Sequence, residues 1–157
     1  MRAIKDVTDK DVKIKWVNDI IYNEKKVAGI LAEVYKDKII LGVGINYTIK
    51  NDSFPEDIKD IAISLYNGNY KCDTDPLDLV NAFIKNMIYL IENKADDYIK
   101  EYIEKNIVIG KKVDIYKLGN KISTGEAVSI DNNCFLHVIE KNGNEAVLSS
   151  GEISVKI

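Results

Sequence analysis

The stretch KIKWVNDIIYNEKKVAGILAE, Lys13–Glu33, decides the fold that we expect for this chain. Up to Trp16 its apolar residues alternate with lysines, which is the period of a half-buried strand. An Asn-Asp pair at 18–19 interrupts the alternation, because both residue types favour turns. Two further apolar runs, Lys26–Tyr35 and Ile39–Tyr47, each follow a short polar turn. Strands joined by short polar turns predict an antiparallel meander.

Helices are expected before and after this meander. Residues 1–10 resemble the end of a helix. Ser53-Phe54-Pro55-Glu56 predicts a helix start with Ser53 as the cap, and apolar residues continue at helical spacing to Leu65. Asp75-Pro76 predicts a longer helix by the same logic, with an apolar stripe that reaches Ile91. A further helical piece is expected over Tyr98–Ile103.

The pattern changes after about residue 107. Five short apolar runs alternate there with turn residues such as Gly119-Asn120 and Asn142-Gly143. Strands this short and closely spaced predict a small all-β barrel. We therefore expect two domains, residues 1–106 and 107–157. The runs are Lys112–Leu118, Lys121–Ile130, Cys134–Glu140, Glu145–Leu148 and Ile153–Ile157.

Composition excludes several classes of protein. The 157 residues are 46% hydrophobic, so the chain can bury a core, and no apolar run is long enough to span a membrane. The net charge of −3 gives no basic footprint for nucleic acid. The polar first residues do not resemble a secretory signal. Cys72 and Cys134 lie far apart and have no metal-ligand spacing, so free thiols in a reducing cytoplasm are the simpler interpretation.

Glycines in the predicted strands point to a possible ligand site. Strict alternation in the run ILGVGIN puts Gly42, Gly44 and Asn46 on one face and leaves an apolar face for the core. One interpretation is a flat ligand that lies against the backbone; the alternative is a bulge or close helix packing. Gly29 poses the same question, and alternation puts the side chain of Lys26 on the opposite face from it. A solvated lysine at a hairpin end is the alternative to a lysine that binds a carboxylate or phosphate.

Taken together, these motifs resemble the biotin–protein ligase family. The family's segments K-W-P-N-D, K-[LVI]-[AG]-G-I-L-x-E and G-[IVA]-G-I-N correspond here to Lys15–Asp19, Lys26–Glu33 and Gly42–Asn46. Phe54-Pro55 followed by IAISL is similar to a later family stretch. GKKV from Gly110 and the closing GEISV from Gly151 resemble its C-terminal barrel. The resemblance implies an α+β fold, with part of a class II synthetase-like mixed sheet, flanking helices and a small SH3-like barrel.

The chain departs from the family pattern in two respects. Val17 stands where proline is usual, which leaves the turn before Asn18-Asp19 more conformational freedom. The family's S-T-N segment and its arginine-rich G-R-G-R-x-G-R loop have no counterpart, and Arg2 is the only arginine. The sequence therefore resembles the C-terminal part of such a ligase, and we expect it to make little biotinyl-adenylate by itself.

The resemblance also implies roles for individual residues. Lys26 matches the catalytic lysine and, with Gly29, would contact biotin. Asp19 would act in catalysis and hold Mg²⁺ at the phosphates of ATP. The nucleotide would lie against the backbone of Gly42 and Gly44. The side chains of Asn18, Asp19 and Asn46 would also bind it. The implied activity is ATP-dependent attachment of biotin to a lysine of a biotin carboxyl carrier protein.

Two other functions stay open at this point. One is a non-catalytic binding or assembly module that keeps the ligase architecture, and the other is a lipoate ligase. A separate N-terminal half or a second copy of the chain is a further expected partner, because an incomplete sheet would expose an edge and an apolar face. His137, the only histidine, is interpreted more simply as a surface residue than as a general base.

Overall fold

The computed structural model describes residues 1–69, 74–93, 97–149 and 153–157. Cys72, part of the turn expected at Ser149-Ser150-Gly151 and Glu152 of the closing motif lie outside the described residues. The chain forms two compact units. The first contains Met1–Lys13 and Asn18–Ala95, and the second contains Ile14–Val17 and Asp96–Ile157. The short strand β1 (Lys13–Lys15) lies where the chain passes from the first unit to the second.

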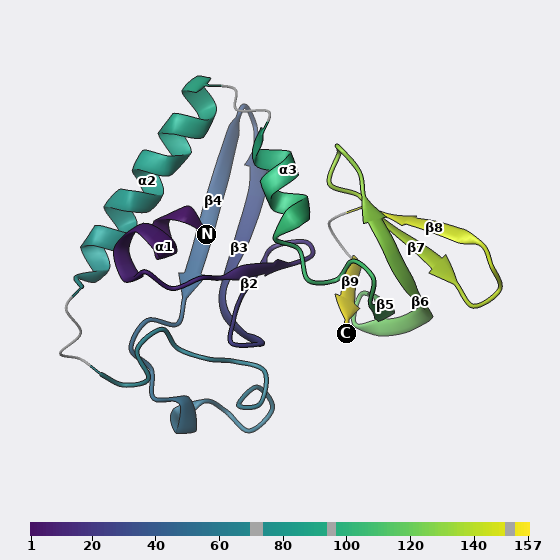
Figure 1. The fold of residues 1–157 in the computed structure, drawn as a ribbon, viewed down its shortest axis with the longest axis horizontal. Coiled ribbons are helices and arrows are strands. Elements are labelled where there is room, and N and C mark those ends of the chain that lie inside the picture. The colour runs from purple at the N-terminus through teal and green to yellow at the C-terminus, as the bar shows by residue number, and fades with distance from the viewer. Residues whose placement is uncertain (70–73, 94–96, 150–152) are drawn as a thin grey trace. The chain divides into compact units, whose positions relative to one another are not determined.

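Among the described residues, β1 belongs to a four-stranded sheet in the order β1-β2-β3-β4, whose other strands are β2 (Asp19–Tyr22), β3 (Lys25–Tyr35) and β4 (Lys38–Ile45) (Figure 1). β2, β3 and β4 are antiparallel to one another. The predicted meander is confirmed, although Asp19 opens a strand of its own instead of ending a turn. Asn23 and Glu24 between β2 and β3 both have positive φ, 46° and 65°. Tight hairpin turns of type I′ need this conformation at both central residues, because it matches the twist of the flanking strands.

A β-bulge in β3 determines which way the side chain of Lys26 points. Ile20 pairs with Ala28, but the next residue, Ile21, pairs with Lys26, so that Val27 is the extra residue. A bulge of this kind re-aims the side chains on one side of it. The side chain of Lys26 therefore lies on the same face as Gly29, and the expectation from strict alternation that they point to opposite faces is wrong.

The first unit has a helix within residues 1–10, where helical residues were expected, and a second helix that begins at Pro76, as the sequence predicts. α1 (Arg2–Thr8) lies against α2 (Pro76–Asn93), and Asn86 Nδ2 donates a hydrogen bond to Asp6 Oδ2 at 3.1 Å. The Asp75 carboxylate accepts a hydrogen bond from the Leu77 amide at 2.8 Å. This is the N-cap that the Asp-Pro pair predicts. No helix in the described part of the chain is both long and apolar enough to cross a lipid bilayer.

The prediction of a helix from Ser53 to Leu65 is wrong. Only a short 3₁₀ turn, η1 (Asn51–Ser53), and irregular turns lie there. Residues 61–65 are instead extended along the start of β3. The Lys26 amide donates to the Ile61 carbonyl at 2.7 Å, and the Ile63 amide donates to the Lys26 carbonyl at 2.9 Å. These tertiary hydrogen bonds satisfy the backbone groups that a helix would have satisfied internally.

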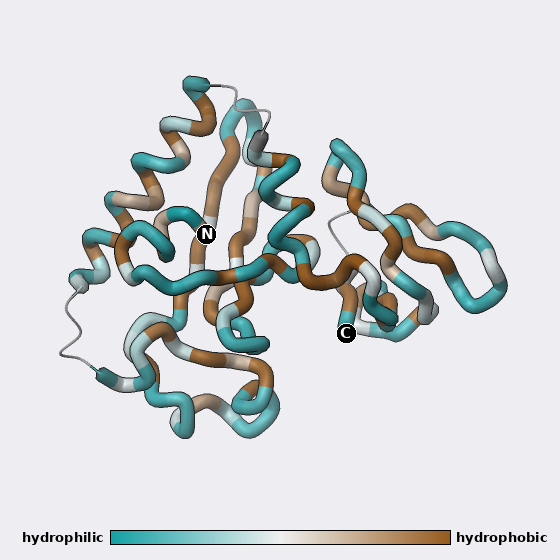
Figure 2. The backbone as a smooth tube through the Cα atoms, viewed as in Figure 1, coloured by the Kyte–Doolittle hydropathy of each residue, from teal (hydrophilic) through white to brown (hydrophobic). Residues whose placement is uncertain are grey.

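Many apolar side chains of the first unit are exposed. Figure 2 shows apolar residues in brown along β3, β4 and α2. Leu41 and Val43 were expected to face a core, but each is 38% exposed. No described residue buries the outer half of the β3–β4 hairpin, so its apolar residues stay in contact with water. The exposed apolar residues of β3, β4 and α2 are Leu31, Val34, Tyr35, Ile39, Ile40, Leu41, Val43, Leu77, Val80, Ile84, Ile88, Tyr89 and Ile91.

The second unit contains α3 (Asp97–Glu104) and a sheet of five antiparallel strands in the order β8-β7-β6-β5-β9. The strands are β5 (Lys112–Lys117), β6 (Asn120–Ile130), β7 (Leu136–Glu140), β8 (Glu145–Leu148) and β9 (Ile153–Lys156), close to the predicted ranges. Their inward residues form a core that also contains Trp16. Gly125 is required in β6, since a Cβ there would lie 2.5 Å from the Ile139 carbonyl oxygen.

Candidate active site

Lys26 and Asp19 form an ion pair on one face of the first unit's sheet. Lys26 Nζ lies 2.5 Å from Asp19 Oδ1. Asp19 is at the start of β2 and pairs with Gly29, while Lys26 reaches the same face because of the bulge at Val27. The side chain of Lys26 is 49% exposed and that of Asp19 is 24% exposed. A partly exposed cation of this kind can exchange its carboxylate partner for an anionic ligand at little cost.

Three glycines form a floor beside this ion pair. Gly29 pairs with Gly44, and Leu31 pairs with Gly42, so that Gly29, Gly42 and Gly44 share one face of the β3–β4 hairpin. A Cβ at Gly29 would lie 3.3 Å from Lys26 Nζ, while a Cβ at Gly44 would meet no atom within 4 Å. A ligand can therefore approach the backbone closely at Gly44, and the missing side chain at Gly29 leaves room for the ammonium group of Lys26.

An open hollow of about 410 Å³ lies over this floor. Six of the seven residues that the sequence predicts as site residues line it: Asn18, Asp19, Lys26, Gly29, Gly42 and Gly44. Ile30, Leu31 and Val43 also line it and were not predicted. The position of Leu31, two residues after Gly29 in the same strand, is the sequence signal that would have found it.

The two asparagines are held by backbone carbonyl groups. Asn18 Nδ2 donates to the Ile30 carbonyl at 2.5 Å, and the Ile30 amide donates back to the Asn18 carbonyl at 3.1 Å. Asn46, the seventh predicted residue, does not line the hollow. Its Nδ2 donates to the Ile63 carbonyl at 3.2 Å. The structure thus places Asn18 at the hollow and Asn46 beside the extended segment 61–65.

Asp19 offers limited support for the predicted Mg²⁺ site. Among the described residues, no three His, Cys, Asp or Glu side chains gather in a way that could hold a metal ion. The Asp19 carboxylate is also paired with Lys26. Mg²⁺ is commonly bound by one or two carboxylates together with substrate phosphates and water. Asp19 therefore fits only as a single protein ligand beside the phosphates of a bound nucleotide.

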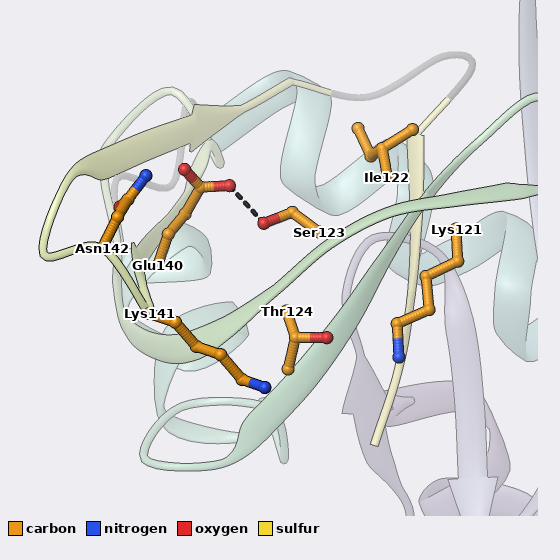
Figure 3. A pocket seen from close by; sticks show the side chains of 7 residues that line it. All are labelled: Lys121, Ile122, Ser123, Thr124, Glu140, Lys141 and Asn142. Carbon is orange, nitrogen blue, oxygen red and sulfur yellow. Dashed lines mark hydrogen bonds between the residues drawn. The ribbon is translucent and has the colours of Figure 1, made fainter.

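A larger hollow, of about 690 Å³, lies on the second unit (Figure 3). Several of its polar groups are already paired with one another or with neighbours. Lys121 Nζ lies 2.7 Å from Asp114 Oδ2, and the Ser123 hydroxyl donates to the Glu140 carboxylate. No sequence-predicted site residue lines this hollow, so its size alone does not make it the functional site.

Two family profiles match the chain at its two ends. The Biotin/lipoate A/B protein ligase family matches residues 1–49, which contain β2, β3, β4 and the ion pair. The Biotin protein ligase C terminal domain matches residues 108–156, which contain the five-stranded sheet. Both matches agree with the fold, and the α+β architecture expected from the resemblance is confirmed.

Named relatives point to the same family. The chain is 35% identical over 91 residues to the bifunctional ligase/repressor BirA of Bacillus spizizenii, covering 55% of this chain and 26% of that protein. It is 27% identical to the biotin–[acetyl-CoA-carboxylase] ligase of Mycobacterium tuberculosis, covering 94% of this chain and 54% of that protein. The chain thus spans about half the length, or less, of these relatives.

Solved structures of the Aquifex aeolicus biotin protein ligase match almost the whole chain. The superposition has a TM-score of 0.79 at 30% identity and covers 98% of this chain and 68% of the Aquifex chain. A structure of the same ligase in complex with biotin and ATP gives a TM-score of 0.76. The chain therefore belongs to the biotin protein ligase family.

Proposed function

We propose that this chain contributes part of a site that activates biotin with ATP and transfers it to a lysine of a biotin carboxyl carrier protein. The observation that carries the proposal is the ammonium group of Lys26 beside a floor of three glycines and the Asp19 carboxylate. The Aquifex relative, of similar fold, has been crystallised with biotin and ATP. Both ligands are acids, which a cation over open backbone is suited to bind.

The proposed reaction has two steps. In the first, a biotin carboxylate oxygen attacks the α-phosphorus of ATP and the bond to the β-phosphate breaks, which gives biotinyl-adenylate and pyrophosphate. In the second, the amine of the acceptor lysine attacks the acyl carbon, AMP leaves and the amine loses a proton. In the first step negative charge accumulates on the oxygens of the α-phosphate, and in the second step it accumulates on the acyl oxygen and on the phosphate of the departing AMP. A fixed cation at that point lowers the barrier, and this is the role that we assign to Lys26.

The other residues of the hollow have supporting roles in this proposal. Gly29, Gly42 and Gly44 let the acyl-adenylate lie close to the backbone. Asp19 orients the Lys26 ammonium group, faces the phosphates together with Mg²⁺, or receives the incoming acceptor amine. Asn18 ties Asp19's end of β2 to β3 through its two hydrogen bonds with Ile30. Asn46 would contact the nucleotide only by giving up its bond to the Ile63 carbonyl.

We further propose that the complete site needs polypeptide beyond these residues. The hollow is open, so water would reach a bound acyl-adenylate. Lys26 alone would also leave the phosphates without a full set of surrounding cationic groups. The complementary part of the ligase, either as a separate N-terminal half or through a second copy, is the expected partner. The exposed apolar residues of β3 and β4 favour this interpretation. They also favour the second candidate function, a binding or assembly module that retains the ligase fold.

Substitution of Lys26 tests the proposed function. Biotinyl-5′-AMP is titrated into the protein by calorimetry, and pyrophosphate release is followed with biotin, ATP and Mg²⁺. We expect measurable binding but little turnover by this chain alone. Lys26→Met keeps the length of the side chain and removes its charge. We expect it to weaken binding by about 10- to 100-fold, the loss typical of a hydrogen bond to a charged group.

Lys25→Met is the matched control for this experiment. Lys25 is the neighbouring residue, but its ammonium group contacts the Lys59 carbonyl at 3.3 Å instead of lining the hollow. We expect it to bind the adenylate as the unchanged protein does. Equal binding by both variants would remove Lys26 from the site, and robust pyrophosphate release by the chain alone would refute the proposed need for further polypeptide.

A further inference from the structure

The bulge that turns Lys26 toward Asp19 is held by hydrogen bonds along one side of β3. In a regular strand the carbonyl groups of consecutive residues point to opposite sides. Here the Ile63 amide donates to the Lys26 carbonyl and the Asn46 amide donates to the Val27 carbonyl, both at 2.9 Å. Asn46 directly follows β4 and is bonded to Ile63 through its side chain, so both donors lie on the β4 side of the strand. These two bonds therefore stabilise the bulge.

Residues 61–65 bind both polar backbone groups of Lys26. Besides the bond from the Ile63 amide, the Lys26 amide donates to the Ile61 carbonyl at 2.7 Å. Ala62, between these two partners, is buried and forms a parallel bridge with Lys26. The segment belongs to no helix or strand of the described chain, so other contacts must keep it in this position.

Ser64 provides two of these contacts. Its hydroxyl donates to the Tyr47 carbonyl at 2.7 Å, and its amide donates to Asn51 Oδ1 at 3.0 Å. Ser64 is only 3% exposed, so water does not readily replace either partner. Because Ser64 directly follows Ile63, its bonds restrain the residue whose amide holds the Lys26 carbonyl.

We propose that Ser64 is a positioning residue for Lys26, with the side chain of Asn51 as its support. Ser64 does not line the hollow and acts only through the segment 61–65. While that segment is held, the bulge persists and the ammonium group of Lys26 stays beside Asp19. Loss of the Ser64 hydroxyl loosens the segment and lets Lys26 leave this position. The consequence for catalysis rests on the proposed function, but the first test below needs no ligand.

Ser64→Ala removes the hydroxyl group and is the first test variant. Amide hydrogen exchange measured by NMR at Ile63 and Lys26 reports on the two bonds between the segment and β3. We expect exchange at both amides to become about five- to tenfold faster, as loss of roughly one hydrogen bond implies. The Ile30 amide, bonded to the Asn18 carbonyl in the same sheet, is the internal control and should exchange at its former rate.

Three further variants make this test specific. Asn51→Ala removes the acceptor of the Ser64 amide and should also accelerate exchange at Ile63, whereas Asn51→Asp keeps an oxygen acceptor and should not. Ser53→Ala is the matched control, since it removes a hydroxyl that contacts the Asp52 carboxylate at 3.4 Å, and it should change neither amide. The proposal is overturned if Ser64→Ala and Asn51→Ala leave exchange at Ile63 unchanged, or if the Ile30 control accelerates equally.

Adenylate binding distinguishes positioning of Lys26 from a general structural role. Biotinyl-5′-AMP is titrated by calorimetry into the unchanged protein, Ser64→Ala, Lys26→Met and the double variant. We expect Ser64→Ala to weaken binding about fivefold where Lys26 is present and not at all in the Lys26→Met background, because the two residues are coupled. Equal weakening in both backgrounds would show that Ser64 does not act through Lys26. Absence of binding to the unchanged protein would refute the proposed function, and the exchange rates would still decide whether Ser64 holds Lys26.

Discussion

The orientation of Lys26 shows what a residue-level interpretation of this sequence can and cannot predict. Most residues that line the hollow were predictable from the motifs taken together, because their combination resembles a known family, while each motif alone has a simpler explanation. The face of the sheet on which the ammonium group lies was not predictable. It depends on the bulge at Val27, and no residue type in KKVAGI marks that position as the extra one.

Gly44→Val tests whether the glycine floor exists to admit a ligand. A Cβ at Gly44 would meet nothing within 4 Å, and a β-branched residue suits a strand, so we expect the melting temperature to stay the same or rise. The new methyl groups would project over the hollow and reduce adenylate binding by tenfold or more. Calorimetry and a thermal melt measure the two effects separately.

Ala32→Val is the control for that substitution. Ala32 pairs with Leu41 on the opposite face of the hairpin and does not line the hollow. Adenylate binding should be the same as in the unchanged protein. If Gly44→Val also bound normally, the glycines would have to be explained by strand geometry alone.

At the scale of elements, the strands and helices with strong local signals were predictable, and one segment was not. Asp75-Pro76 combines a cap with a residue that cannot be placed later in a helix, and α2 begins there. The stretch from Ser53 to Leu65 has a similar cap signal but no helix. Backbone hydrogen bonds join its last residues to Lys26 and Asn46, and the Ser64 hydroxyl donates to the Tyr47 carbonyl. These partners are far away in sequence, so local pattern analysis does not detect them.

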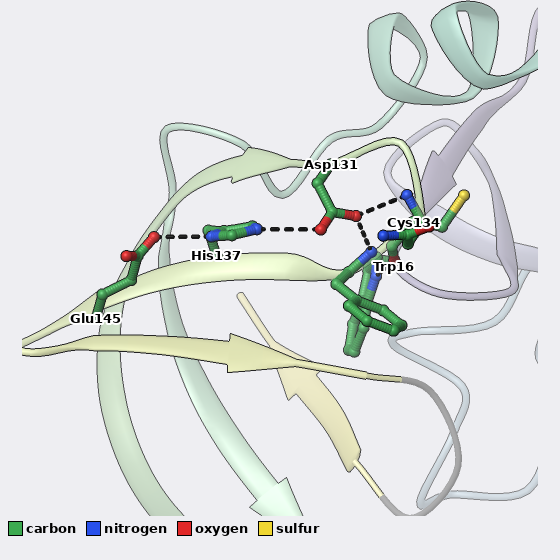
Figure 4. A network of polar contacts seen from close by, with 7 residues as sticks. Trp16, Asp131, Cys134, His137 and Glu145 are labelled. Carbon is green, nitrogen blue, oxygen red and sulfur yellow. Dashed lines mark hydrogen bonds and ion pairs between the residues drawn. The ribbon is translucent and has the colours of Figure 1, made fainter.

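The sheet of the second unit carries a pH-dependent contact. Hydrogen bonds to Glu145 and then Asp131 (Figure 4) raise the pKa of His137 above its ordinary value of 6.5. The charged groups that face the ring are these two carboxylates, while its β6 partner is the uncharged Ser129. Because the folded protein binds the proton more tightly, this contact contributes stability that is fully present below pH 6.5. The contribution is lost as the pH rises through the raised folded-state pKa.

Comparison of the unchanged protein with His137→Gln measures this effect. We expect the unchanged protein to melt at a higher temperature at pH 5.5, and the difference to shrink by pH 8.5. Glu145→Gln removes the first partner of the ring and should flatten the pH dependence. A difference in melting temperature that stays constant from pH 5.5 to 8.5 would contradict the assignment.

At the scale of the whole molecule, the exposed apolar residues of the β3–β4 hairpin predict association. Val34 and Ile39 face each other across the hairpin and are 79% and 74% exposed. Monomeric proteins rarely leave large apolar patches in water, and β4 is the last strand of its sheet, with no strand among the described residues paired to its outer edge. We expect the protein to self-associate at micromolar concentration in sedimentation velocity experiments.

The double substitution Val34→Lys and Ile39→Glu should shift the protein toward the monomer. The two new side chains oppose each other and can form a cross-strand ion pair, so the hairpin should not be destabilised. The midpoint of urea unfolding verifies that the fold is retained. Association that persists unchanged would show that this surface is not the one that self-associates.

The bulge at Val27 has a consequence for how members of this family are compared. A family member with the same lysine, aspartate and glycines at the same spacing, but with β2 and β3 paired without the bulge, would have its ammonium group on the other side of the sheet. A motif search would score such a chain as intact. The register of the two strands around the bulge is therefore as informative a criterion for a working member as the identity of the charged groups.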